Sequence, residues 1–241
     1  MQTPTHKHAL ITGGTGALGR AVVSRFLEHD YHCHVTWADK RELTDLPFAD
    51  DDRITLHELD VTDESSVVEY YADRVANEAY LRASIHIVGG FAMAPVTETT
   101  AADFERMWRL NTLSCFLCCR EAVRRFRGQP SDESDAVCGR IVNVAARPAV
   151  APVGGMVAYS ASKAAVASIT QSLAEEVKAD PILVNAIVPS IMDTPANRAA
   201  MPDADHDAWP KVADVARAIY HLASPDNVLT SGALVPVYGR C

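Results

Sequence analysis

The chain has 241 residues, of which 48% are hydrophobic and 22% charged, a composition typical of a globular protein with a sizeable core. Its length favours one large α/β domain over two. Lys and Arg number 22 against 31 Asp and Glu, a net charge of −9, which argues against nucleic acid or an anionic membrane as the main partner. No apolar run approaches the ~18 residues of a membrane span and the N-terminus lacks a signal-like segment, so we expect a cytoplasmic protein.

Strands and helices alternate along the chain. Short apolar runs predict strands at 8–12, 34–38, 54–59, 84–88, 139–144, 182–188 and 232–237. Helical periodicity predicts helices at 18–29, 64–79, 100–127, 159–179 and 212–223. This alternation predicts an α/β fold of the Rossmann type, a doubly wound parallel sheet in three α/β/α layers, with residues 1–241 in a single domain. The proline-rich stretch 190–210 has no period, and we expect it to be a substrate loop.

A glycine-rich turn separates the first strand from the first helix. Glycines there let the backbone approach a pyrophosphate, and the helix N-terminus offers N–H groups and partial positive charge. The turn therefore predicts a dinucleotide site, and the whole chain is then an NAD(P)-binding domain. The residues expected to contact the cofactor at this turn are Gly13, Thr15, Gly16, Ala17, Leu18 and Gly19.

The end of the second strand carries mixed signals for the choice between NAD and NADP. Asp39 would hold the ribose hydroxyls of NAD, whereas Lys40 and Arg41 would neutralise the 2′-phosphate of NADP. The balance favours NADP slightly and leaves NAD open. Trp37 is a candidate for contact with the adenine, and so is the pair Asp60 and Val61 after the third strand.

Tyr159 and Lys163 are four residues apart at the start of a predicted helix, so their side chains project from one face. A nearby ammonium, together with the positive charge of an oxidised nicotinamide, favours the phenolate of a tyrosine. Lowering a phenol pKa by about 3 units requires roughly 4 kcal/mol of differential interaction, which close charges in a partly desolvated cleft can supply. The pair is therefore expected to exchange a proton with a substrate oxygen during hydride transfer.

Taken together, these motifs resemble those of the short-chain dehydrogenase/reductase family over nearly the whole chain. The resemblance implies an NAD(P)-dependent oxidoreductase in which Lys163 also binds the nicotinamide ribose and Asn111 holds a water in a proton relay. It further implies cofactor contacts from Gly89, Gly90 and the segment after the sixth strand, and a homodimer or homotetramer packed through helices 103–127 and 159–179. The matching residues are Thr12 to Gly19, Asp60, Val61, Asn111, 141–144, Tyr159, Lys163, 184–189, Thr194 and Pro195. The expected nicotinamide contacts are Pro189, Ile191 and Thr194.

The chain departs from the family pattern at the position of the catalytic serine, where it has Ala146. Loss of one preorganised donor costs on the order of 10²–10³ in rate for an ordinary carbonyl. The dihydropteridine reductases look similar here, with a small residue at this position and a loop like 193–205. The resemblance therefore makes a small carbonyl, an imine or a quinonoid compound such as a dihydropteridine the expected substrate. The expected substrate contacts are Ala146, Arg147, Tyr159 and Asn197.

Cys115, Cys118 and Cys119 lie in a predicted helix, and no histidine or fourth thiol accompanies them in the sequence, so we expect buried thiols and no metal site. The missing serine leaves one alternative function open. The chain could be a dinucleotide-binding regulatory protein without turnover, although the intact pair of Tyr159 and Lys163 argues against it.

Overall fold

The computed structural model describes residues 7–75, 80–130 and 135–241. Its seven strands form one parallel sheet in the order β3-β2-β1-β4-β5-β6-β7. The order reverses between β1 and β4, and in open α/β sheets ligands bind at the carboxyl ends of the strands beside such a switch point. The strands are β1 (Lys7–Thr12), β2 (Tyr31–Trp37), β3 (Ile54–Glu58), β4 (Leu81–His86), β5 (Gly139–Val144), β6 (Ile182–Pro189) and β7 (Leu234–Val237).

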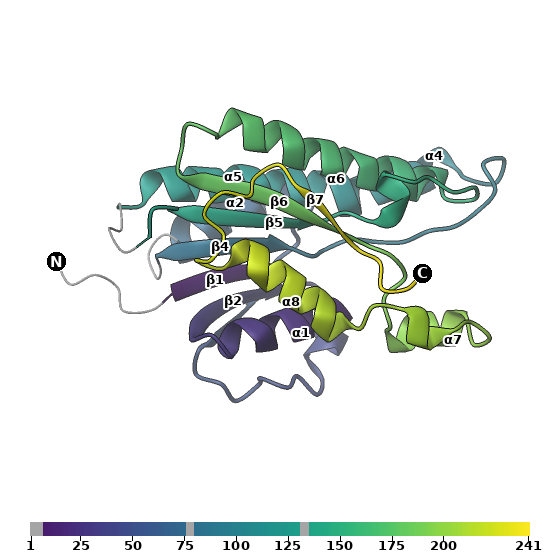
Figure 1. Ribbon diagram of the computed structural model, residues 1–241, viewed down its shortest axis with the longest axis horizontal. Coiled ribbons are helices and arrows are strands. Elements are labelled where there is room, and N and C mark those ends of the chain that lie inside the picture. Colours follow the sequence, from purple (N-terminus) through teal and green to yellow (C-terminus); the bar gives the residue numbers. More distant parts are fainter. Residues whose placement is uncertain (1–6, 76–79, 131–134) are drawn as a thin grey trace.

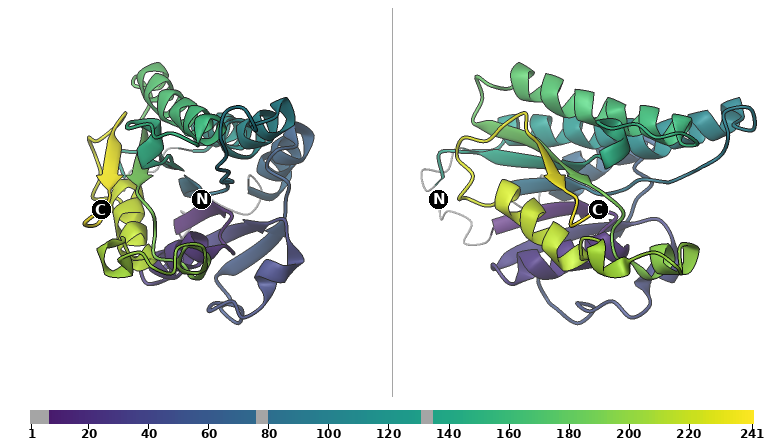
Figure 2. Two further views of the ribbon diagram at one scale, coloured as in Figure 1. Left: turned by 90° about the vertical axis from the view of Figure 1, so that its right-hand side faces the viewer. Right: turned by 45° about the vertical axis from the view of Figure 1, so that its right-hand side comes forward.

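Helices cover both faces of the sheet, as the alternating pattern predicts (Figure 1). Helices α1 (Ala17–Leu27) and α8 (Val212–Ala223) pack together on one face. The opposite face carries α2 (Glu64–Glu69), α4 (Ala101–Met107), α5 (Ser114–Gly128) and α6 (Val157–Glu176). The end-on view on the left of Figure 2 shows the three layers, and the Rossmann-type α/β/α fold is confirmed. Within the described residues, no helix is long and apolar enough to cross a membrane.

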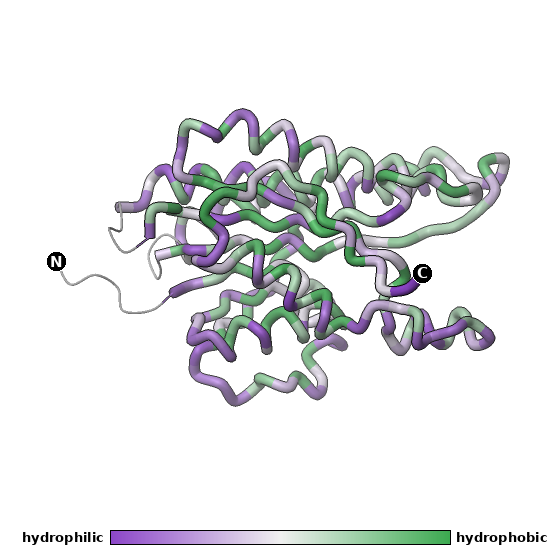
Figure 3. Tube along the Cα trace, in the orientation of Figure 1, coloured by the Kyte–Doolittle hydropathy of each residue, from purple (hydrophilic) through white to green (hydrophobic). Residues whose placement is uncertain are grey.

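Burial of both faces explains why the central strands are apolar throughout. Every residue of β4 and β5 is buried, because helices cover the sheet on each side. One core cluster includes Leu117 and Phe126 of α5, and the other includes Val22 and Phe26 of α1. Figure 3 shows the same division, with hydrophobic segments along the strands and hydrophilic ones on the outer helical turns.

Some predicted boundaries were wrong. β4 begins at Leu81 instead of residue 84. The strand includes the buried Arg82, whose guanidinium lies 3.8 Å from Asp135 and over the ring of Tyr80. A buried arginine inside a strand breaks the apolar run that the sequence pattern relies on. The strand also ends at His86, so residues 87 and 88 belong to the following turn.

The helix predicted at 64–79 changes character along its length. It is α-helical to Glu69 and continues as a π-helical turn at Tyr70–Val75, while residues 76–79 lie outside the described part of the chain. The predicted loop 190–210 contains α7 (Pro195–Ala200) and a 3₁₀ turn at His206–Ala208. Thr194 accepts a hydrogen bond from the backbone N–H of Asn197 and Pro195 is the first residue of α7, so the Thr-Pro sequence begins a helix. The four prolines of this stretch had instead suggested a loop without a helix. Helix α7 lies at the carboxyl end of the sheet (Figure 1).

Candidate active site

The glycine turn after β1 is too tight for side chains at two positions. Gly13 has a φ of +66°, in the left-handed region that disfavours other residues. A Cβ on Gly19 would lie 2.1 Å from the carbonyl oxygen of Gly13, so the start of α1 packs directly on the turn. A Cβ on Gly16 would meet only the Gly13 oxygen at 3.5 Å, and no side chain caps the N-terminus of α1. This open, uncapped helix start fits a pyrophosphate.

The turn is held from the far side by the segment that follows β2. The hydroxyl of Thr15 donates to Glu42 at 2.5 Å, and the guanidinium of Arg20 donates to the carbonyl of Thr15 at 2.7 Å. Arg20 also donates to the carbonyls of Glu42, Thr44 and Asp45, so it connects α1 to this segment. Arg20 and Glu42 could not be predicted from the sequence, because neither belongs to the glycine motif.

Asp39 and Arg41 form a local pair at the end of β2. The Asp39 carboxylate accepts from the backbone N–H of Arg41 at 2.9 Å and from its guanidinium at 2.5 Å. The hydrogen bonds from Arg41 lower the pKa of Asp39 to about 2. Both side chains reach solvent, with Arg41 90% and Asp39 39% exposed. Trp37 is half-buried and Lys40 is exposed nearby.

The turn after β3 is organised by Asp60, which accepts from the backbone N–H and the hydroxyl of Thr62, both at 2.8 Å. Val61 is buried, whereas Asp60 is exposed. Arg109, from the helical segment opposite, donates to the carbonyl of Thr62 at 3.3 Å. The pair Asp60 and Val61 therefore lies next to the helix that carries Asn111.

Asn111 is positioned by a change of helical geometry. Residues Trp108–Leu113 form a π-helical turn between α4 and α5, a feature that often marks functional sites. The buried amide of Asn111 accepts from the N–H of Gly90 at 3.0 Å and donates to the carbonyl of Gly90 at 3.1 Å. It also donates to the hydroxyl of Ser162 at 3.0 Å, and that hydroxyl donates to the carbonyl of Tyr159. Asn111 therefore joins the turn after β4 to helix α6.

Lys163 is buried, and its ammonium donates to the carbonyl of Val144 at 2.8 Å. Burial lowers the pKa of Lys163 to about 8. Tyr159 lies one helical turn earlier, half-buried, and burial raises the pKa of its phenol to about 12. The ring of Phe91 stands edge-on to the ring of Tyr159, with centroids 5.0 Å apart. The two predicted catalytic side chains thus emerge from one turn of α6, at the carboxyl end of β5.

The position of the missing serine follows β5 directly. Ala146 is buried and has an extended backbone that any residue can adopt. Arg147 beside it is exposed, and its guanidinium lies 5.1 Å from the ring centre of Tyr238. A hydroxyl at residue 146 would need no change of backbone conformation.

In the segment after β6, several polar side chains form hydrogen bonds and ion pairs with neighbouring residues. The side-chain amide of Asn197 donates to the carbonyl of Met192 at 2.8 Å. Asp193 pairs with Arg198 at 2.5 Å and with Lys211 at 2.7 Å, and these two partners hold its pKa well below the ordinary value. Ile191 is exposed, with the end of β6 at Pro189 before it and the start of α7 after it. Asn197, a predicted substrate contact, therefore uses its side-chain amide to hold the start of α7.

A cavity of about 180 Å³ opens between the turn after β4, helix α4 and the start of α6, and its lining is partly polar, with Asp103 and Arg106 from α4. Met93 and Val157 line it, and both are exposed. The exposed Phe91 immediately precedes Ala92 of the cavity lining, and its ring contacts the Tyr159 ring. Phe91, Met93 and Val157 form an apolar rim that could not be predicted from the sequence, since apolar residues in a loop carry no periodic signal.

The family model for short-chain dehydrogenases matches residues 7–205. The chain belongs to the short-chain dehydrogenase/reductase family. It is therefore an NAD(P)-dependent oxidoreductase that acts on a small molecule, as the motifs predict. The relatives below give no more specific substrate for this chain.

Similar proteins include the uncharacterized oxidoreductase YgfF of Escherichia coli K12, which is 29% identical over 77% of this chain and 76% of its own. The L-2,3-butanediol dehydrogenase of Corynebacterium glutamicum is 28% identical over 78% of this chain and 72% of its own. Among solved structures, ElxO with NADP bound is 27% identical and superposes with a TM-score of 0.88 over 98% of each chain.

Proposed function

We propose that Tyr159 and Lys163 are the proton-transfer pair of a reductase for small carbonyl, imine or quinonoid substrates. The observation that carries the proposal is the position of the Lys163 ammonium, fixed by the carbonyl of Val144 one helical turn from the phenol of Tyr159. The expected lowering of the phenol pKa by Lys163 is not found, because burial alone acts on Tyr159 and raises its pKa to about 12. Tyr159 is therefore a protonated phenol, the form that donates a proton in the direction of reduction. Tyr159 can then give its proton to a substrate oxygen or nitrogen and recover it from the relay.

The bound nicotinamide supplies the hydride in this reaction. The open start of α1, with Gly13, Gly16 and Gly19, would hold the pyrophosphate. Gly89, Gly90, Pro189, Ile191 and Thr194 remain the proposed contacts of the nicotinamide half. Asn111 acts as a positioning residue and proton-relay partner, because its amide joins Gly90 to Ser162 beneath Tyr159.

An activated acceptor fits the site better than an ordinary ketone. Ala146 offers no hydroxyl to a substrate oxygen, so the acceptor must gain its reactivity elsewhere. The apolar rim made by Phe91, Met93 and Val157 favours a flat or apolar substrate. A quinonoid dihydropteridine combines both properties and is the specific substrate that we propose, with Arg147 as a further contact.

NADP is the cofactor that we favour. Lys40 and Arg41 supply positive charge where the 2′-phosphate would lie, and ElxO was solved with NADP bound. Asp39 and Glu42 add negative charge to the same segment, which is why NAD remains the alternative.

We also propose a homodimer or homotetramer packed through α4, α5 and α6. Phe104, Trp108 and Phe116 are large, exposed hydrophobic side chains on the continuous helix from α4 to α5. Aromatic side chains of this kind are enriched at protein interfaces. Gel filtration with light scattering should give twice or four times the mass of the chain.

The Tyr159→Phe variant tests the proposed chemistry. We expect kcat to fall at least ~10³-fold while the Kd for NADPH changes little, because the variant lacks only the hydroxyl. Tyr220→Phe is the matched control, since Tyr220 packs against Phe26 and His29 away from the site and should keep full activity. Tyr159→Phe turnover at the wild-type rate would remove Tyr159 from the mechanism.

The substrate screen uses NADH and NADPH in parallel with aldehydes, ketones, quinones and a quinonoid dihydropterin. The proposal predicts the fastest oxidation with the quinonoid acceptors and the lowest KM for NADPH. Cofactor binding without turnover on any acceptor would support a regulatory protein that senses dinucleotides.

A further inference from the structure

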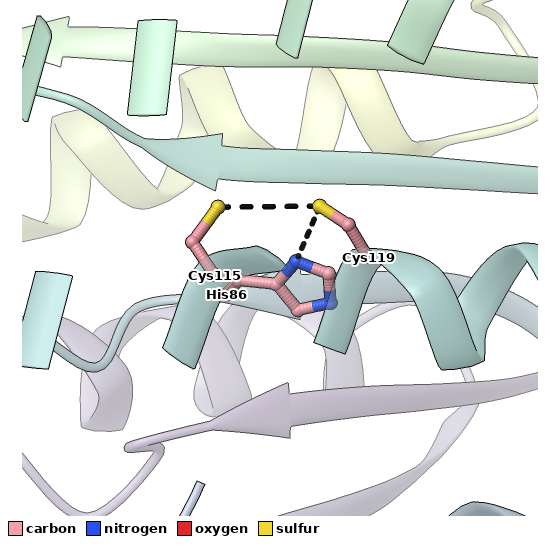
Figure 4. A group of neighbouring side chains, drawn as sticks. All are labelled: His86, Cys115 and Cys119. Atoms are coloured by element: carbon pink, nitrogen blue, oxygen red, sulfur yellow. Dashed lines mark hydrogen bonds between the residues drawn. The ribbon is translucent and has the colours of Figure 1, made fainter. Parts of the chain in front are cut away.

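Two cysteines and one histidine that are far apart in sequence meet in the core behind the catalytic helix. His86 ends β4, and Cys115 and Cys119 lie one turn apart on α5. Figure 4 shows the two sulfur atoms directed toward each other, with that of Cys119 beside the imidazole. The expectation that no histidine accompanies these thiols is therefore wrong. His86 lies 29 residues before Cys115 and on a different element, so the sequence alone did not indicate the contact.

We propose that His86, Cys115 and Cys119 form a buried binding site for a soft, thiolate-binding metal ion of the Zn²⁺ class. The Sγ atoms of Cys115 and Cys119 are 4.0 Å apart, and Sγ of Cys119 is 3.5 Å from Nδ1 of His86. All three ligand atoms lie within 4.8 Å of one another. Around a tetrahedral zinc ion, two sulfurs lie about 3.8 Å apart and a sulfur and a nitrogen about 3.6 Å apart, from the usual bond lengths.

A fourth ligand is available beside the three. Oδ1 of Asn143 is 2.8 Å from Nδ1 of His86 and 3.4 Å from Sγ of Cys119. The amide of Asn143 donates to the hydroxyl of Thr170 at 2.9 Å, which directs Oδ1 toward the cluster. This oxygen completes a Cys₂HisO set, while Ser84, 2.9 Å from Nε2 of His86, orients the imidazole.

The charges balance in a neutral complex. Both thiols lose their protons to solvent on binding, and His86 keeps its single proton by moving it from Nδ1 to Nε2, where Ser84 can accept it. Two thiolates and one Zn²⁺ sum to zero, which a fully buried site requires. A disulfide fits less well, because Cβ atoms four residues apart on a helix lie about 5–6 Å apart, beyond the 3.5–4.5 Å that a disulfide needs.

The site lies close to the proposed catalytic machinery. Asn111 precedes Cys115 by one helical turn, and Gly89 follows His86 by three residues. A bound ion would join β4 to α5 immediately before the turn and the helical segment that hold Asn111. We therefore expect the metal to stabilise this region while leaving the substrate cleft open.

The test measures bound zinc in the wild-type protein and in the Cys115→Ala/Cys119→Ala variant after gel filtration. Zn²⁺ is supplied both to folded protein and during refolding, because the ligands are buried. Wild type should retain one more Zn²⁺ per chain than the variant, release two protons per ion, and gain thermal stability with Zn²⁺ but not with Mg²⁺. Zinc held elsewhere on the chain, for example by the neighbouring pair His8 and His34, is the same in both proteins and cancels.

Cys118→Ala is the matched control, since Cys118 is equally buried on the same helix but is not among the grouped ligands. It should keep the extra ion. Cd²⁺ substitution should give the near-ultraviolet absorption of metal thiolates in wild type and in Cys118→Ala only. If the double variant fails to fold, the single variants Cys119→Ser and Cys118→Ser make the same comparison. Equal zinc in wild type and the ligand variant, after both loading routes, would overturn the proposal.

Discussion

Gly89 lies so close to Asn111 that a Cβ on residue 89 would be 2.5 Å from Oδ1 of the Asn111 side chain. The same Cβ would be 3.0 Å from Nζ of Lys163. The turn after β4 therefore packs its backbone against two of the proposed catalytic side chains. The φ of Gly89 lies outside the left-handed region, so the backbone conformation does not require glycine here. The close approach to Asn111 and Lys163 does.

Gly89→Ala should lower kcat on the order of 10²-fold, because the methyl group must displace Asn111 and the Lys163 ammonium from their positions. The melting temperature should fall only slightly, since the turn is at the surface. Steady-state kinetics and thermal unfolding check both effects. Gly128→Ala is the control, because a Cβ there meets nothing within 4 Å, and it should leave kcat unchanged. Wild-type activity in Gly89→Ala would show that the relay tolerates this displacement.

Lys163→Met should abolish turnover and stabilise the fold. Burial lowers the pKa of Lys163 from 10.5 to about 8, so holding the ammonium in the folded state costs stability at neutral pH. Replacing it with methionine should raise the free energy of unfolding by on the order of 1–3 kcal/mol. Urea unfolding at pH 7 measures the difference. Lys178→Met, at an exposed pair with Glu175, should change neither activity nor stability.

The same shift fixes the sign of a pH effect. Between pH 8 and pH 10.5 the unfolded chain binds a proton at Lys163 that the folded chain has lost, so the free energy of unfolding rises with pH in this window. Tyr159 acts oppositely above pH 10, because its folded-state pKa is raised to about 12. Between pH 8 and pH 10, the free energy of unfolding of the wild type should therefore rise relative to that of the Lys163→Met variant. A constant difference between the two proteins would contradict burial of the charge.

The glycine turn and the Tyr159 to Lys163 spacing could be predicted because each is a local pattern. The parallel sheet and the two helical layers followed from alternation alone. The start of β4 could not, since Arg82 forms its buried partner contact with a residue 53 positions later. Arg20, Glu42 and His86 were missed for the same reason. Each acts through a partner on another element, and a single sequence contains no record of which distant residues meet.

Asp39→Asn should strengthen the preference for NADPH. Asp39 now engages the guanidinium of Arg41, and the neutral amide would free that charge for a 2′-phosphate. We expect KM for NADPH to fall several-fold and KM for NADH to rise. Asp51→Asn is the matched control, because Asp51 holds Arg53 in the same way just before the start of β3, at the opposite end of the strands. A lower KM for NADPH in both variants would point to net charge instead of a specific contact.

Ala146→Ser should supply the hydroxyl that the site lacks. The backbone of Ala146 is extended and accommodates serine without strain, and the new donor would lie at the carboxyl end of β5 beside Tyr159. We expect kcat/KM for simple aldehydes and ketones to rise on the order of tenfold or more, because a donor preorganised for the developing oxyanion lowers the barrier.

Turnover of a quinonoid dihydropterin should change by less than threefold in Ala146→Ser, since an acceptor that is already electron-poor gains little from one more donor. Ala149→Ser, in the following turn, controls for the added hydroxyl and should leave both substrates unaffected. The ratio of the two kcat/KM values is the decisive measurement. Equal acceleration of both substrates would mean that the wild-type site is not adapted to activated acceptors, and the dihydropteridine proposal would fall.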